Sequence, residues 1–191
     1  MCPDRDLAGT GLRRAAFLDR DGVINIDHGY VSDWENFDLY PGVVDTMRAL
    51  QEAGYCLVIV TNQSGIGRGY YSEETFWQLM QRLSDFLSQQ GVTVSGVYFC
   101  PHHPTNALPQ YRKACDCRKP APGMLLAAAK DLKIDLAQSL FVGDKRSDME
   151  AGEQAGVGQL FFVNDEGKSH PGAITVSTLA SVPTLLRNKE A

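Results

Sequence analysis

Short runs of apolar residues recur along this chain, and they constrain its fold more than any other feature. Residues 15–18, 56–60, 139–142 and 160–163 are almost wholly apolar, and residues 94–99 alternate. Unbroken apolar runs of this length are typical of central strands in a parallel sheet, which are buried on both faces. The runs therefore predict a sheet that lies between two layers of helices.

Segments with helical periodicity separate these runs. Helices are predicted between Gly42 and Gly54, between Ser72 and Gly91, from Pro122 to about Leu132 and from about Asp148 to Ala155, with a last strand and helix after Ile174. Strands that alternate with helices indicate an α/β fold, a doubly wound parallel sheet with right-handed crossovers. Ligands of such sheets bind outside the carboxyl ends of the strands.

Length and charge narrow the class of protein. The 191 residues suit one domain, predicted at residues 14–191 behind a flexible N-terminal tail at residues 1–13. The tail lacks the apolar centre of a secretory signal, and no apolar run is long enough to predict a membrane span. The net charge of -5 argues against a nucleic-acid binder. We expect a cytoplasmic monomer with neither a membrane nor a nucleic-acid partner.

Polar groups follow three of the predicted strands at the point where each strand ends. These groups are Asp19-Arg20-Asp21-Gly22, Thr61-Asn62-Gln63 and Gly143-Asp144, and Arg118-Lys119-Pro120 joins them from a loop. A phosphate dianion repels an anionic nucleophile, so a carboxylate attacks phosphorus only where cations screen the charge and hold the reactants in line. Carboxylates together with a lysine are suited to that chemistry.

Cysteine and histidine cluster in the loop at residues 100–117. Cys100, Cys115 and Cys117 offer three thiolates, and His102 or His103 offers an imidazole. Four such ligands suit tetrahedral zinc, and a site without an open position is structural rather than catalytic. The alternative, a disulfide to Cys100, is disfavoured because the chain lacks secretory features.

The motifs FLDRDG, TNQ, RKP and VGDKRSD, in that order and after apolar runs, resemble the four motifs of haloacid dehalogenase superfamily phosphatases. The resemblance covers most of the chain and implies a Rossmann-like fold. It implies that Asp19 is the nucleophile that becomes phosphorylated, that Asp21 is the general acid and base, and that Thr61 binds the phosphoryl oxygens. Lys119 would neutralise charge on Asp19 and on the phosphate.

The same resemblance implies the metal ligands. Mg²⁺ would be bound by the carboxylates of Asp19 and Asp144 and by the backbone carbonyl of Asp21. Asp148 would support the metal through water or by contact with a ligand. For the second metal, zinc, the resemblance favours His102 over His103, with the three cysteines. Zinc would then fix the loop so that Arg118 and Lys119 point into the site.

The glycines of SGIGRG, residues 64–69, invite a nucleotide-loop interpretation. The segment has neither the G-x-G-x-x-G spacing nor a GK[ST] ending, so a flexible active-site loop is the better prediction. Arg68 is either solvated or in contact with the substrate.

The stretch between Gly22 and Pro41 is too short for a cap domain, so selectivity must come from loops. Within the superfamily, a zinc loop with DCRKP is shared by heptose bisphosphate phosphatases and histidinol-phosphate phosphatases. The segments INIDHGYV, TNQSGIGRG and CPHHP resemble the former group, which implies a small sugar bisphosphate as substrate. The predicted substrate-binding residues are Asp27, His28, Gly29, Tyr30, Asn62, Gln63, Ser64, Arg118 and Lys145.

Within this set, Arg118 and Lys145 are the candidates for recognising a second phosphate, and Asp27 and His28 could instead form an ordinary turn. A histidinol-phosphate phosphatase is the alternative enzyme. A non-catalytic, zinc-stabilised binding module is a third hypothesis, which the acidic balance and the intact Asp19, Lys119 and Asp144 argue against.

Overall fold

The computed structural model of the protein describes residues 9, 11–164 and 166–190. Most of the predicted N-terminal tail, residues 1–8 and 10, therefore lies outside the described residues. Arg13, the last residue of the predicted tail, forms backbone hydrogen bonds with the segment at residues 133–135. Its backbone N–H donates to Lys133 O at 2.9 Å, and its carbonyl accepts from Asp135 N at 2.8 Å.

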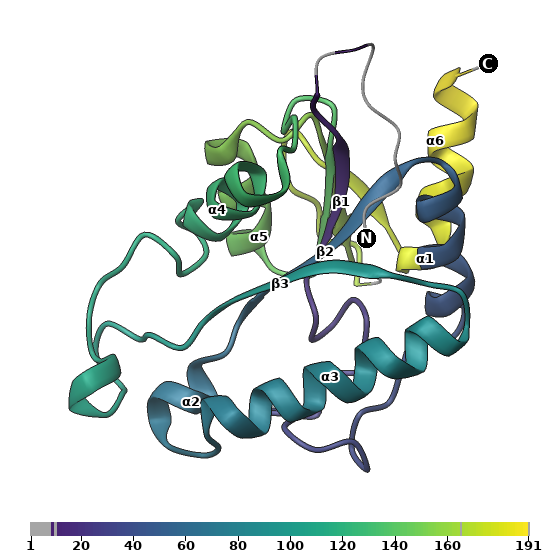
Figure 1. Ribbon diagram of the computed structural model, residues 1–191. Helices are drawn as coiled ribbons and strands as arrows, with labels where there is room; N and C mark the ends of the chain where they lie inside the picture. Colours follow the sequence, from purple (N-terminus) through teal and green to yellow (C-terminus); the bar gives the residue numbers. More distant parts are fainter. Residues whose placement is uncertain (1–8, 10, 165, 191) are drawn as a thin grey trace.

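Six strands form one parallel sheet in the order β3-β2-β1-β4-β5-β6 (Figure 1). The strands are β1 (Arg14–Leu18), β2 (Tyr55–Asn62), β3 (Val94–Cys100), β4 (Leu140–Gly143), β5 (Gln159–Val163) and β6 (Ile174–Val176). The first strand, β1, lies in the middle of the sheet; the chain then winds to one edge and returns to wind to the other. This topology confirms the predicted doubly wound α/β fold.

Helices cover both faces of the sheet (Figure 1). They are α1 (Val43–Glu52), α2 (Ser64–Arg68), α3 (Glu73–Gln89), α4 (Gly123–Leu132), α5 (Arg146–Ala155) and α6 (Val182–Glu190), with short 3-10 helices at Pro109–Tyr111 and Leu179–Ser181. Successive side chains of a strand point to opposite faces. Leu18 accordingly packs in the cluster with α1 and α3, and Phe17 packs with α4 and α5.

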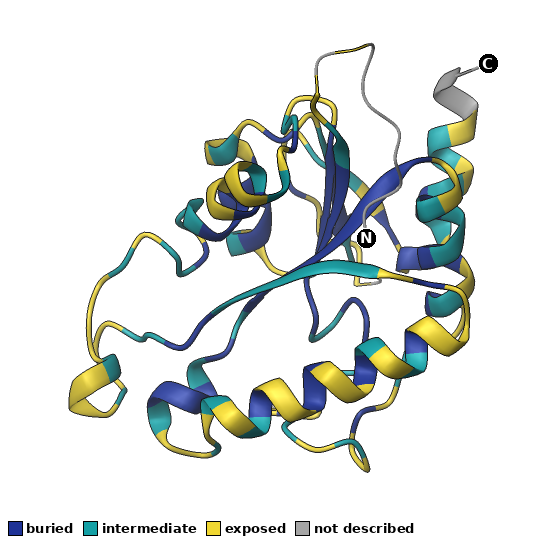
Figure 2. Cartoon of the chain, in the orientation of Figure 1, coloured by how far each residue is buried: buried dark blue, intermediate teal, exposed yellow. Residues whose placement is uncertain are grey.

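The buried strands form the dark centre of Figure 2, whereas α3 is exposed along its outer surface. Phe17, Leu18 and Phe141 have no solvent-exposed surface. Full burial of an apolar side chain of this kind contributes about 1.5–3 kcal/mol. The strand ends, and the polar residues that follow them, are thus anchored to the best-packed part of the molecule.

Local signals explain where the helices begin. The Ser72 hydroxyl accepts from Thr75 N at 3.0 Å and caps α3, as the sequence predicts. Helix α5 begins at Arg146, slightly before the predicted Asp148. The reason is that the Asp148 carboxylate accepts the Lys145 N–H at 2.8 Å and so caps the first turn from within.

The segment predicted as a flexible active-site loop is instead the short helix α2, whose Gly65, Ile66 and Gly67 are buried. A Cβ on Gly67 would lie 2.2 Å from Pro101 O, so the glycine permits α2 to pack against the backbone of the loop after β3. Gly69 ends the helix with a φ of 78°. These glycines serve close packing, which glycine spacing alone does not reveal.

Residues 19–42 contain only isolated bridges and turns, with neither a helix nor a sheet strand. This agrees with the prediction that a cap domain is absent. In the part of the chain that the structure describes, we find no helix with the length and apolar character needed to cross a membrane.

Candidate active site

Three aspartates meet at the carboxyl end of the sheet. Asp19 follows β1, Asp144 follows β4, and Asp148 comes from the first turn of α5. One carboxylate oxygen from each lies within 4.8 Å of the other two. Asp148 is fully buried and Asp19 is 4% exposed. The winding order places the ends of β1 and β4 side by side, which is why residues distant in sequence converge here.

Lys119 lies among these carboxylates. Its Nζ is 3.0 Å from Asp19 Oδ1 and 2.7 Å from Asp148 Oδ1, and it donates to Val60 O at 3.0 Å. The Asn62 side chain holds the lysine's backbone, donating to Lys119 O and accepting from Lys119 N, each at 3.1 Å. A residue of the long loop is thereby fixed to the end of β2.

Burial and mutual repulsion control the protonation of this cluster. Burial raises the pKa of Asp19 to about 7, against the opposing effect of Lys119 and with further increases from Asp148 and Asp144. Burial also raises the pKa of Asp144 to about 6, and Lys145 opposes it. Burial lowers the pKa of Lys119, but Asp148 and Asp19 outweigh it and the net shift is upward. One buried lysine faces three carboxylates, so the site retains an affinity for another cation.

The donor set fits a hard divalent cation. Asp144 Oδ1 is buried and has no hydrogen-bond partner among the described residues. A Cβ on Gly22 would lie 2.2 Å from Asp144 Oδ2, so the absence of a side chain at Gly22 leaves room for that carboxylate beside the backbone of the Asp21 loop. Carboxylate and carbonyl oxygens in this arrangement are the ligands that Mg²⁺ prefers.

Asp21 is held on both carboxylate oxygens. Oδ1 accepts from Arg20 Nη2 at 2.8 Å, Arg20 Nε at 3.2 Å and Asn25 Nδ2 at 3.0 Å, and Oδ2 accepts from Gln63 Nε2 at 3.0 Å. Arg20 is fully buried, and its guanidinium also donates to Val31 O at 2.7 Å. The Asp21 carboxylate thus has a defined orientation beside Asp19.

A cavity of about 230 Å³ opens beside Asp21. It is lined by Asp21, Asp27, Gly29, Tyr30, Asn62, Gln63, Ser64, Gly65, Tyr71 and Lys145. Most of the predicted substrate-binding residues therefore meet at one place. Two lie outside this lining: His28 Nε2 is 2.8 Å from Asp38 Oδ2, and Arg118 Nη1 donates to His102 O at 3.1 Å.

A second and larger cavity, of about 510 Å³, adjoins the first. Asp27 and Lys145 line both cavities, and their side chains are paired at 3.4 Å between Oδ2 and Nζ. Lys145 Nζ is also 3.9 Å from Asp144 Oδ2. This lysine therefore connects the carboxylate cluster with both spaces. Arg68, for which two roles were open, is half-buried with its guanidinium over the ring of Tyr30.

Sequence reasoning missed three residues of the site: Arg20, Asn25 and Tyr71. Arg20 and Asn25 fix Asp21, and the Tyr71 hydroxyl donates to Gln63 Oε1 at 2.6 Å. Arg20 lies inside the FLDRDG motif, but its position there does not reveal that its guanidinium is buried. The hydrogen bonds that give Asn25 and Tyr71 their places depend on how loops fold back on the sheet.

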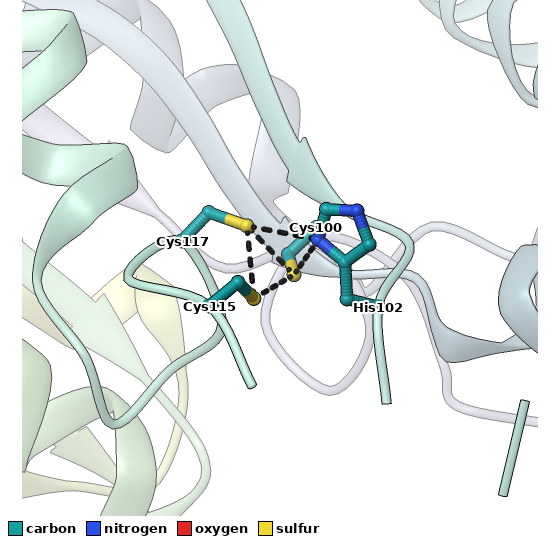
Figure 3. Close-up of side chains that lie close together, drawn as sticks. All are labelled: Cys100, His102, Cys115 and Cys117. Atoms are coloured by element: carbon teal, nitrogen blue, oxygen red, sulfur yellow. Dashed lines mark hydrogen bonds between the residues drawn. The ribbon is translucent and has the colours of Figure 1, made fainter. Parts of the chain in front are cut away.

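The cysteines and His102 form a compact cluster (Figure 3). Cys117 Sγ lies 3.0 Å from Cys100 Sγ, 3.2 Å from Cys115 Sγ and 3.3 Å from His102 Nδ1. The four ligand atoms all lie within 4.8 Å of one another and could hold a metal ion. His103 is directed elsewhere, since its Nδ1 accepts from Asn106 N at 3.0 Å.

The loop that carries the cluster contacts the helices α2 and α3 and leads directly into Lys119. Leu108 N donates to Gly67 O at 2.7 Å, and Tyr111 Oη donates to Glu73 Oε1 at 2.9 Å, so the loop contacts both α2 and α3. Lys119 follows Cys117 by only one intervening residue, Arg118. The position of the cluster therefore limits where Lys119 can lie relative to the carboxylate site.

The order of the sheet, the acidic strand ends and the lysine define a class of hydrolase. Residues 9–156 match the haloacid dehalogenase-like hydrolases, and the chain belongs to this family.

Comparison with individual relatives is more specific. A protein from Photorhabdus laumondii named D-glycero-beta-D-manno-heptose-1,7-bisphosphate 7-phosphatase is 46% identical over 179 residues, which cover 91% of this chain and 95% of the relative. A protein of the same name from Vibrio cholerae is 54% identical over 149 residues, covering 78% and 80%. The solved D,D-heptose 1.7-bisphosphate phosphatase from B. bronchiseptica, complexed with magnesium and phosphate, aligns with a TM-score of 0.80 at 31% identity, covering 92% and 99%.

Proposed function

We propose that this protein hydrolyses the C7 phosphate of D-glycero-D-manno-heptose 1,7-bisphosphate through an aspartyl-phosphate on Asp19. The observation that carries the proposal is the placement of Lys119 Nζ against Asp19 Oδ1 at 3.0 Å, beside Asp144 and Asp148. Asp144 lines the larger of the two cavities, and Asp21 lines the smaller. Relatives up to 54% identical are named as phosphatases of this substrate, which supports the substrate assignment. The reaction belongs to the making of nucleotide-activated heptose for surface polysaccharide.

The first half-reaction phosphorylates the enzyme. An oxygen of Asp19 attacks phosphorus while the bond from phosphorus to the C7 oxygen breaks, and the electron pair stays on that oxygen. Asp21 gives its proton to the departing alkoxide. Thr61 and nearby backbone N–H groups bind the transferring oxygens, and Lys119 balances the negative charge of Asp19 and of the phosphoryl group.

The second half-reaction restores the enzyme. Asp21, now a carboxylate, takes a proton from water as the water oxygen attacks phosphorus, and the bond from phosphorus to Asp19 breaks. Phosphate leaves, and Asp21 is again protonated. Asp21 can serve in both steps because its side chain borders the substrate cavity.

Mg²⁺ is the metal that we assign to Asp19, Asp144 and the backbone carbonyl of Asp21. Bound there, it would supply the positive charge that screens the phosphate from the nucleophile. The Asp148 carboxylate accepts the backbone N–H of Lys145 and pairs with Lys119. It therefore positions Lys119 and the segment that follows β4, and it is not required as a metal ligand.

Zn²⁺ is the ion that we assign to Cys100, His102, Cys115 and Cys117. Three thiolates and an imidazole leave no open position, which makes the site structural. None of these three cysteines is joined in a disulfide, which fits a reducing compartment, and we place the protein in the cytoplasm.

We assign substrate recognition to the residues around the smaller cavity. Gly29 and Tyr30 would border the sugar, and Lys145, together with Arg118 from the zinc loop, would bind the phosphate at C1. Asp27, His28, Asn62, Gln63 and Ser64 complete the proposed set. The side-chain amides of Asn62 and Gln63 are engaged by protein groups, so their part in recognition includes holding other residues in place.

Phosphate release under steady-state conditions tests the function. We expect the enzyme with Mg²⁺ to turn over heptose 1,7-bisphosphate at least about tenfold more efficiently than histidinol phosphate, since leaving a buried polar group of the site without its partner costs about 1–3 kcal/mol. The product should retain its C1 phosphate. Equal or inverted efficiencies would reject the substrate assignment while leaving the phosphatase chemistry intact.

A further inference from the structure

Three side chains form a hydrogen-bonded chain that ends on Asp21. Tyr71 Oη donates to Gln63 Oε1 at 2.6 Å, and Gln63 Nε2 donates to Asp21 Oδ2 at 3.0 Å. The same Nε2 donates to Thr61 Oγ1 at 2.8 Å. Gln63 is 2% exposed, so these partners rather than water determine how its amide lies.

Asp21 and Tyr71 together favour one orientation of the Gln63 amide. Burial raises the pKa of Tyr71 to about 12, so the hydroxyl keeps its proton at neutral pH and remains a donor. The amide therefore presents its oxygen to Tyr71 and its N–H groups to Asp21 and Thr61. The reverse orientation would place Gln63 Oε1 against an oxygen of the Asp21 carboxylate, which pairs two acceptors, and would turn the Tyr71 hydroxyl from donor to acceptor.

This orientation matters for the two residues, Asp21 and Thr61, that accept from Gln63 Nε2. Asp21 Oδ1 already accepts from Arg20 and Asn25, so Oδ2 is the oxygen with capacity for a transferable proton. Gln63 holds Oδ2 in one direction. At Thr61 the amide occupies a lone pair of the hydroxyl, so the hydroxyl proton remains free for a phosphoryl oxygen.

The position of Tyr71 is itself built into the fold. A Cβ on Gly65 would lie 2.4 Å from Tyr71 Cε1 and 2.8 Å from Cζ, so the ring lies directly against the glycine. Tyr70 N donates to Gly65 O at 2.9 Å and brings the chain back over α2. The SGIGRG segment thus has a role that its glycine pattern does not indicate: Gly65 leaves room for the ring of Tyr71, which then reaches Gln63.

We propose that Tyr71 is a positioning residue for leaving-group protonation, acting through Gln63 to direct Asp21 Oδ2 toward the departing oxygen. The proposal rests on the proposed function, in which Asp21 is the general acid. It extends that function by assigning the protonation step a second set of residues: Gln63, which directly precedes α2, and Tyr71, which lies in the turn that follows the helix.

The test compares two leaving groups. The value of kcat/KM reports the steps up to phosphorylation of Asp19, in which the alcohol departs. A sugar alkoxide needs a proton to leave, whereas 4-nitrophenolate does not. For Tyr71→Phe we expect kcat/KM to fall about tenfold on heptose 1,7-bisphosphate, the size of one lost oriented hydrogen bond, and less than about twofold on 4-nitrophenyl phosphate.

Control variants separate this effect from a loss of structure. Tyr98→Phe removes a phenol hydroxyl that donates to Asp131 Oδ2 at 3.1 Å outside the site, and it should leave both activities unchanged. In a Gln63→Ala background, Tyr71→Phe should cause no further loss, because Tyr71 acts only through the amide. Equal losses on both substrates, or additive losses in the double variant, would overturn the proposal.

Asp21→Asn distinguishes failure of this proposal from failure of the proposed function. We expect it to lose far more activity on the heptose bisphosphate than on 4-nitrophenyl phosphate. That result together with an insensitive Tyr71→Phe would overturn the positioning role alone. Equal losses for Asp21→Asn on the two substrates would overturn the assignment of Asp21 as the acid, and the positioning role with it.

Discussion

The two candidate metal sites of this protein are built in opposite ways. The carboxylate site lies at the ends of β1, β2 and β4, and Asp19, Lys119 and Asp148 are each at most 4% exposed. The Cys/His cluster lies on a loop that extends away from the sheet (Figure 1), and among its four residues only Cys100 is buried. Cys100 is also the only one of the four that belongs to a strand.

The difference concerns what holds each site together. The carboxylate site is positioned by the core, and like charges forced together by folding create its affinity for a cation. The loop at residues 100–117 has few apolar residues of its own to bury, so we expect its order to depend on an ion that joins the ligands. Removing charge from the first site should therefore affect chemistry, and removing a ligand from the second should affect stability.

Replacing the proposed nucleophile should have the largest effect on activity. Asp19→Asn keeps the shape of the side chain and relieves repulsion among the buried carboxylates, so the fold should persist. We expect turnover to fall by at least about a thousandfold, because no covalent intermediate can form. Phosphate release and a thermal melt check this, and substantial residual activity would show that the nucleophile lies elsewhere.

Removing the buried lysine should have the next largest effect. Lys119→Met preserves the length of the side chain but leaves Asp19 without its cation, and we expect kcat/KM to fall about 100-fold to 1000-fold. Zinc content, measured by elemental analysis, should remain that of the unaltered protein. A loss of zinc in this variant would show that the two sites are not as separate as their construction suggests.

The Cys/His cluster offers a matched pair of histidine variants. His102→Ala removes an imidazole of the cluster, and His103→Ala removes its neighbour, whose Nδ1 accepts a backbone N–H instead. We expect only the first to lose zinc and to lower the melting temperature, by several degrees, with activity falling about tenfold as Lys119 loses its support. Equal zinc retention in both variants would contradict the ligand assignment.

Breaking the hydrogen bonds that join Lys119 to β2 should have a smaller effect. Asn62→Ala removes the two hydrogen bonds that fix the backbone of Lys119 to β2, and we expect stability to fall by about 1–2 kcal/mol and kcat about threefold to tenfold. As the control, Gln154→Ala removes an exposed amide that donates to the neighbouring Pro120 O at 3.0 Å. The control should change neither quantity, and matching losses would deny Asn62 a special role.

Lys145→Ala should have the smallest effect. Its side chain is 55% exposed and pairs with Asp27 between the two cavities. We expect KM for the bisphosphate to rise severalfold with little change in kcat, since one cationic contact to substrate is lost while the nucleophile is untouched. An unchanged KM would remove Lys145 from the proposed binding site.

Prediction from sequence succeeded where the signal is local. The apolar runs become β1, β2, β4 and β5, and the boundaries of α1, α3 and α4 agree closely with the proposed starts and stops. The same reasoning failed at α2, which it treated as flexible. Glycine lowers helix propensity, and only the close approach of Pro101 and Tyr71 explains why the segment is helical and buried.

The sequence by itself determined the order of strands and helices, the residues at each strand end and the clustering of cysteines, because these follow from periodicity and from side-chain chemistry. The motifs also led us to expect Lys119 beside Asp19. Tertiary structure alone decided the other contacts: that Lys119 also pairs with Asp148, that the buried Arg20 guanidinium holds Asp21, and that Tyr71 reaches Gln63. Such contacts join residues far apart in the chain or loops that fold back on themselves. They depend on the register and packing of the whole sheet, which a local pattern does not encode.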